Sequence, residues 1–131
     1  MQVLIKEETF AGKILDKITL EINQEILTVG ELIAFKVEDA VARHNKQVET
    51  EQQGFIHENE AQLNSKLHTH NFVNRQKVDK EQEVYKAWQA FKENQMLVMV
   101  DNHQVTDLEE EIVMNEYTDL SFIRLPHMVG G

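Results

Sequence analysis

The strand-like segments of this chain lie near its two ends, and the helix-like segments lie between them. Residues 2–8 and 13–22 read as strands near the N-terminus, and residues 96–100 and 120–125 read as strands near the C-terminus. A strand needs a hydrogen-bonded neighbour, so strands from both ends are expected to share one sheet. Helices from the middle of the chain can then cover one face of that sheet. We therefore predict an α+β fold with a mixed sheet.

A helix start signal follows the first two strands. Thr28 and Glu31 form the T-x-x-E pattern of a capping box, in which the threonine hydroxyl accepts from the Glu31 amide and the glutamate reaches back. Apolar side chains then recur at helical spacing along one face. That face holds Ile33, Val37, Ala40 and Val41. We expect the helix to end near His44, because the helix dipole favours a histidine in the last turn.

The middle of the chain reads as a helical insertion over residues 46–95. Its first part, to residue 74, is polar and carries few apolar side chains, so we expect it to be the more mobile part. Gly54 is expected to interrupt any helix there. A second helix is predicted over 79–94, with Asp79 as its cap and apolar residues at helical spacing. These residues are Val84, Ala87, Trp88 and Phe91.

Turn signals separate the predicted strands. Ala11-Gly12 suits a turn between the first two strands, and Asp101-Asn102-His103 suits a hairpin that lets Gln104-Val105 pair back. The stretch from 107 to 116 is acidic and reads as irregular. We expect it to be anchored by three inward side chains, which are Leu108, Ile112 and Val113.

Length and composition bound the class of protein. A chain of 131 residues with 41% hydrophobic side chains is long enough for one domain with a real core. No apolar run approaches the roughly 20 residues that span a bilayer, and the N-terminal MQVLIKEETF carries acids where a signal peptide needs bases. The chain has no cysteine, which excludes disulfides and thiolate chemistry on its own side chains. A cytoplasmic location without membrane contact is the expected default.

The net charge of −10 is concentrated near the C-terminus. Residues 96–131 carry one basic and seven acidic side chains, a net charge of −6, whereas residues 1–45 carry −3 and residues 46–95 carry −1. Such a surface repels nucleic acid, so we expect no nucleic-acid partner. It either attracts a basic protein partner or serves only as a solvated face.

The order of elements and the chain end together resemble a known family. The predicted order is strand, strand, helix, insertion, strand, short strand and final strand, which becomes a β-grasp if the first and last strands lie side by side in the centre. The C-terminal stretch MLVMVDNHQVTDLEEEIVMNEYTDLSFIRLPHMVGG resembles the ubiquitin-like sulfur carriers, such as the small subunit of molybdopterin synthase and the thiamine-pathway carrier. The matching residues are Asp119, Leu120, Phe122, Ile123, Pro126, Gly130 and Gly131. The resemblance covers both ends of the chain and not residues 46–95.

The resemblance implies a carrier or modifier that is itself no enzyme and holds no cofactor. In that family an adenylating, E1-like enzyme uses ATP and magnesium to activate the C-terminal carboxylate, which sulfur or an amine then captures. Gly130 and Gly131 would be the activated terminus here, since glycine lets the backbone approach catalytic groups closely. The residues expected to dock the activating enzyme are Phe122, Arg124, Pro126, His127, Met128 and Val129. The sequence does not separate sulfur transfer from protein conjugation, although the enlarged insertion argues mildly against a housekeeping cofactor carrier, which needs only the minimal fold.

Two further interpretations stand beside the carrier. The chain could be a non-covalent protein-binding module on the same scaffold, with the insertion as its binding surface and Gly-Gly incidental. His68 and His70, with His57, offer imidazoles for a metal, but an H-x-H pair on a helix points its rings to different faces, so we expect a solvated segment and no metal.

Trp88 and Phe91 are expected to pack in the core, with a partner-binding face as the alternative.

Overall fold

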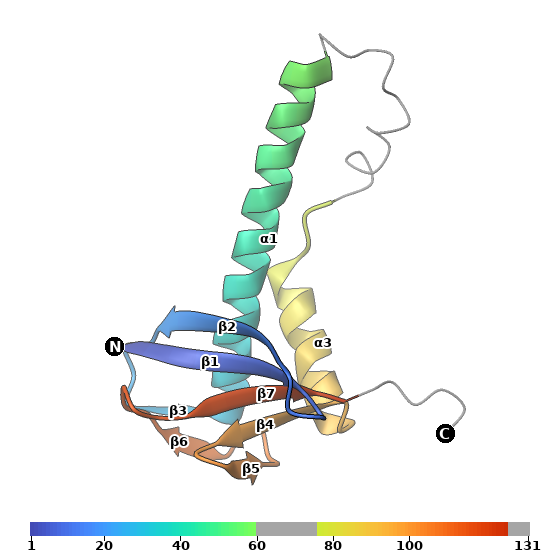
Figure 1. The fold of residues 1–131 in the computed structure, drawn as a ribbon. Coiled ribbons are helices and arrows are strands. Elements are labelled where there is room, and N and C mark those ends of the chain that lie inside the picture. Colours follow the sequence, from blue (N-terminus) through green and yellow to red (C-terminus); the bar gives the residue numbers. More distant parts are fainter. Residues whose placement is uncertain (60–75, 126–131) are drawn as a thin grey trace, which may run out of the picture.

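The computed structural model describes residues 1–59 and 76–125, and for residues 52–59 it describes the backbone alone. Five strands form one sheet in the order β2-β1-β7-β4-β5 (Figure 1). Their bounds are Gln2–Thr9 for β1, Ile14–Glu21 for β2, Met96–Val100 for β4, His103–Val105 for β5 and Leu120–Arg124 for β7. The central pair, β1 and β7, is parallel, and the other pairs are antiparallel. The prediction that strands from both ends share one mixed sheet is confirmed, and the fold is α+β.

The face of the sheet beneath the helices holds the core. Val3 and Ile5 of β1 are fully buried, and β7 places Leu120 and Phe122 beside them on the same face. The pleat alternates side chains between faces, so every second residue of each central strand points to the helices. Ile14 of β2, by contrast, is 45% exposed. It lies at the start of β2, where the strand leaves the core.

Both predicted hairpin turns are present. Gly12 has a φ of +91°, which a residue with a side chain rarely adopts, and its amide donates to the Thr9 carbonyl at 2.9 Å. Asp101 and Asn102 have φ values of 50° and 67° and connect β4 to β5 as the two central residues of a tight hairpin. Two consecutive positive φ values match the twist of antiparallel strands, and Asp and Asn tolerate them best among residues with side chains.

The long helix α1 begins where the capping box predicts and ends much later. It spans Val29–Asn59, with the Glu31 amide donating to Thr28 Oγ1 at 3.1 Å and the Thr28 amide donating to Glu31 Oε1 at 3.2 Å. The expected end near His44 is wrong, and so is the expected break at Gly54, which lies inside the helix. Glycine costs about 1 kcal/mol in a helix but keeps its amide donor, so it weakens a helix without terminating it. Figure 1 shows the second half of α1 projecting beyond the sheet.

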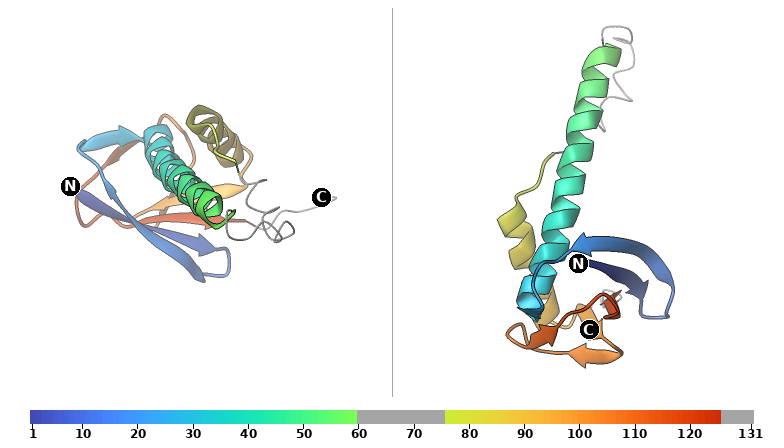
Figure 2. Two further views of the ribbon diagram at one scale, coloured as in Figure 1. Left: turned by 90° about the horizontal axis from the view of Figure 1, so that it is seen from above. Right: turned by 90° about the vertical axis from the view of Figure 1, so that its left-hand side faces the viewer.

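The second helix, α3, spans Lys80–Lys92 and lies alongside α1 (Figure 2). Asp79 caps it as predicted, with its carboxylate accepting from the Glu81 amide at 3.3 Å. Phe91 is buried and Trp88 is partly buried against the core, so the predicted packing of this aromatic stripe is confirmed. The predicted insertion is helical at both ends, over 46–59 and 80–92, and the stretch 60–75 lies outside the described residues.

The structure contains a small second sheet that the sequence analysis did not predict. Strand β3, Ile26–Thr28, pairs antiparallel with β6, Glu111–Val113. The segment from 107 to 116 is therefore not wholly irregular. Ile112 is buried as expected, but the expectation for Val113 is wrong, because it is 69% exposed. Adjacent residues of a strand point to opposite faces, so Ile112 and Val113 cannot both be inward anchors.

None of the helices in the described part of the chain is long and apolar enough to cross a membrane. The core of the domain gathers residues from both sheets and both helices. Its largest fully buried side chains are Ile5, Leu27, Leu32, Ile33, Leu120, Val3, Val29, Val48 and Val98.

Candidate functional site

The C-terminal end of β7 is where the sequence places the functional region, and the described chain reaches it. Arg124 ends the strand, and the Leu125 amide donates to the Gln95 carbonyl at 3.2 Å, which fixes the last described residue against the turn between α3 and β4. Six of the predicted site residues lie outside the described residues. These are Pro126, His127, Met128, Val129, Gly130 and Gly131.

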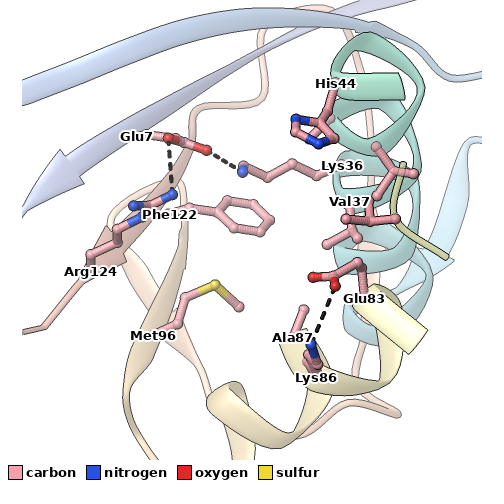
Figure 3. A pocket seen from close by; sticks show the side chains of 13 residues that line it. Glu7, Lys36, Val37, His44, Glu83, Lys86, Ala87, Met96, Phe122 and Arg124 are labelled. Carbon is pink, nitrogen blue, oxygen red and sulfur yellow. Dashed lines mark hydrogen bonds and ion pairs between the residues drawn. The ribbon is translucent and has the colours of Figure 1, made fainter. Parts of the chain in front are cut away.

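A pocket of about 520 Å³ opens beside the end of β7, between α1, α3 and the sheet (Figure 3). The described part of its wall comes from three strands, two helices and the segment that precedes α3. Its lining residues are Glu7, Lys36, Val37, Ala40, Val41, His44, Val78, Glu83, Lys86, Ala87, Met96, Phe122 and Arg124. Two of the predicted docking residues, Phe122 and Arg124, are therefore wall residues of one pocket.

Three charged side chains meet at the strand side of the pocket. Glu7 lies on the same face of β1 as the core residues Val3 and Ile5, so the strand directs its carboxylate inward. Lys36 of α1 reaches across the pocket and forms an ion pair with Glu7 Oε1 (Figure 3). Arg124 Nη2 lies 3.9 Å from Glu7 Oε2, on the other side of the same carboxylate. One carboxylate thus stands between two cations.

Burial distinguishes the two cations. The side chains of Lys36 and Glu7 are only 12% and 16% exposed, whereas that of Arg124 is 71% exposed. The ammonium group of Lys36 is therefore paired with Glu7 inside the pocket wall. Arg124 makes only a long contact with Glu7 and keeps most of its guanidinium donors turned to solvent.

Phe122 forms the floor beneath this charged cluster. It is only 2% exposed, and the Lys36 ammonium lies 5.1 Å from the centroid of its ring. A cation at that distance over an aromatic face is stabilised by the ring quadrupole. Phe122 was expected to dock a partner directly, yet its ring is buried beneath Lys36. In this position the ring supports the side chains that surround the pocket.

The helix side of the pocket is closed by polar contacts that sequence reasoning did not find. Asn45 of α1 accepts from the Val78 amide at 2.9 Å and donates to the Val78 carbonyl at 3.1 Å, which fixes Val78 in the wall. His44 Nε2 lies 3.2 Å from the Gln76 carbonyl. Both partners lie more than 30 residues away in the sequence. No local pattern could have revealed these contacts, because they depend on the return of the chain past α1.

The pocket is less acidic than the protein around it. Its described wall contains three basic residues, Lys36, Lys86 and Arg124, and two acidic residues, Glu7 and Glu83, in a chain of net charge −10. Lys86 Nζ lies 3.4 Å from Glu83 Oε1, and both side chains are partly exposed. The arrangement combines an apolar floor with an excess of positive charge, which suits the binding of an anion attached to an apolar group.

The structure does not test the possible metal site formed by the histidines. His68 and His70 lie outside the described residues, and of His57 only the backbone is described. Within the part of the chain that the structure describes, no three His, Asp or Glu side chains gather as a metal-binding group.

The resemblance to the ubiquitin-like carriers stays a prediction based on the residues named above. Comparisons of the chain with protein-family models, with curated proteins and with solved structures found no match.

Proposed function

We propose that this chain is a β-grasp, ubiquitin-like carrier or modifier whose Gly131 carboxylate is activated by an adenylating enzyme. The observation that carries the proposal is the parallel pairing of β1 with β7 in the centre of the sheet, with Gly130-Gly131 six residues beyond Arg124. The sheet order, with α1 packed over the core face, supports the β-grasp interpretation. The proposal places the carrier in the cytoplasm, leaves sulfur transfer and conjugation open, and makes the chain a substrate and not a catalyst.

The proposed reaction places the reactive atoms at the end of the chain. A carboxylate oxygen of Gly131 attacks the α-phosphorus of ATP, an acyl-adenylate forms and magnesium pyrophosphate leaves. A sulfur or amine nucleophile then attacks the acyl carbon, and AMP leaves with the bonding electron pair. Glycine suits both positions, because it adds no side chain where the enzyme must close around the backbone.

The described residues offer two surfaces for the proposed activating enzyme. Arg124 is highly exposed at the end of β7, and its five donors suit a carboxylate on a partner. The acidic stretch that follows β5 presents exposed carboxylates, which suit a basic surface. These exposed residues are Asp107, Glu109, Glu110, Glu111 and Glu116.

The test is activation by purified adenylating enzymes in the presence of ATP and magnesium. Activation is measured by pyrophosphate exchange, and the adenylate by mass spectrometry. We expect activity with the chain as given and none with a chain lacking Gly131 or extended by one alanine after it. Equal exchange with all three chains would overturn the proposal, as would the absence of exchange with every such enzyme encoded beside this chain's own gene.

A non-covalent binding module is the second candidate, and the pocket beside β7 favours it. Its volume of about 520 Å³ lies within the usual range of ligand sites. A truncated chain ending at Val129 separates the two functions: it loses activation if the chain is a carrier, and it keeps partner affinity if the chain is a binding module.

A further inference from the structure

We infer that the pocket between α1, α3 and β7 binds a small amphipathic carboxylate, with its apolar body between the helices and its carboxylate on Arg124. This site is distinct from the diglycine terminus and does not depend on the proposed carrier function. Part of its wall comes from α3, which belongs to the segment that the resemblance does not cover and which contributes Glu83, Lys86 and Ala87.

The apolar body is accommodated by the wall below the charged cluster. The pocket is large enough for a small organic ligand, and its helix and strand walls supply aliphatic, thioether and aromatic surface. In Figure 3 Phe122 points from β7 toward α1, Met96 lies beside it on the strand side, and Ala87 faces this space from α3. The apolar wall residues are Val37, Ala40, Val41, Val78, Ala87, Met96 and Phe122.

The ligand's carboxylate is assigned to Arg124 because the two cations are paired unequally with Glu7. Glu7 is already neutralised by the mostly buried Lys36, so the long contact from Arg124 can be released without leaving Glu7 unpaired. The exposed guanidinium then has two parallel donors for a carboxylate, a geometry that an ammonium cannot provide. A cationic ligand is disfavoured, because it would face Lys36, Lys86 and Arg124.

The test uses decanoate with two matched probes, 1-decanol and decylammonium, each below its micelle concentration. Binding to the full chain is followed by amide chemical shifts and by calorimetry. We expect saturable binding of decanoate, with shifts at Phe122, Met96 and Val37, and binding of 1-decanol about tenfold weaker because the charge-assisted bonds are lost. Decylammonium should bind least.

Two matched pairs of variants assign the binding to this pocket. Arg124→Gln should weaken decanoate about tenfold and leave 1-decanol unchanged, since only the charge-assisted contact is removed. Arg43→Gln is the control, because Arg43 pairs with Asp39 on α1 and does not line the pocket. Ala40→Leu should fill the pocket and weaken decanoate and 1-decanol alike. Its control is Ala42→Leu, at an exposed position of the same helix outside the wall.

Several outcomes would overturn the inference. These are the absence of saturable decanoate binding, equal affinity for the three probes, or equal effects of Arg124→Gln and Arg43→Gln. A short peptide with a C-terminal leucine is a further probe, because it carries a carboxylate beside an apolar side chain. If it bound as tightly as decanoate, the ligand of the pocket would be a protein C-terminus and not a small carboxylate. The chain ending at Val129 should bind decanoate as the full chain does, so failure of the carrier proposal and failure of this inference are distinguishable.

Discussion

Trp88 Nε1 donates a hydrogen bond to the Gly30 carbonyl at 3.0 Å, across 58 residues of sequence. The same Gly30 donates its amide to the Leu108 carbonyl at 2.8 Å. A Cβ on Gly30 would lie 3.3 Å from that carbonyl oxygen, a tight contact that would push the two segments slightly apart. The first turn of α1, the middle of α3 and the loop before β6 therefore meet at one residue. Through this contact α3 is joined to the core and is more than a surface addition.

Trp88→Phe should destabilise the domain by about 1–2 kcal/mol, because it removes a partly buried hydrogen bond and some packed area. Urea unfolding measures the change. Tyr85→Phe is the control on the same helix, since the Tyr85 hydroxyl accepts from Gln89 Nε2 but the side chain is 59% exposed. It should cost less than about 0.5 kcal/mol. Equal costs for the two variants would show that the contact with Gly30 does not contribute to stability.

The features that the sequence predicted well are those fixed by neighbouring residues. The start of α1 depends on Thr28 and Glu31, three positions apart, and the β4–β5 turn depends on the consecutive residues Asp101 and Asn102. Strand β3 has only three residues and little pattern of its own, so its pairing with β6 is fixed by tertiary contact.

The candidate site was predicted only in part. Phe122 and Arg124 were singled out by their place near the chain end, and both line the pocket. Lys36 and Glu7 were missed, because a charged residue on a helix or strand usually faces solvent. Only the packing of α1 across β1 reveals that these two side chains lie in the wall, paired with each other.

Gly54→Ala should strengthen the second half of α1. Replacing glycine by alanine inside a helix is worth up to about 1 kcal/mol, so amide exchange around residue 54 should slow about fivefold. Gly12→Ala is the opposing control, because Gly12 has a φ of +91° and alanine there should destabilise the turn by about 1 kcal/mol. Unchanged exchange around residue 54 would contradict a continuous helix to Asn59.

Glu7→Gln should destabilise the protein by about 2 kcal/mol, since it leaves the mostly buried Lys36 close to Arg124 without a counter-charge. The matched control is Glu49→Gln, which breaks an ion pair with Lys77 whose side chains are about half exposed. That change should cost no more than about 0.5 kcal/mol. Urea unfolding of both variants gives the comparison, and equal small costs would mean that the Glu7–Lys36 pair behaves as a surface pair.

The exposed acidic stretch gives a kinetic prediction for the proposed activating enzyme. Reversing two charges, Glu109→Lys with Glu116→Lys, should slow association severalfold and weaken its salt dependence, because long-range attraction steers the encounter of oppositely charged surfaces. The urea midpoint should stay the same, because both side chains are exposed. The control is Asp16→Lys with Glu49→Lys, which changes the net charge equally at exposed positions on β2 and α1, outside this stretch. Stopped-flow association at several salt concentrations separates the two: equal slowing by both pairs would assign the effect to net charge alone, and no slowing by either would leave the acidic stretch without a part in docking.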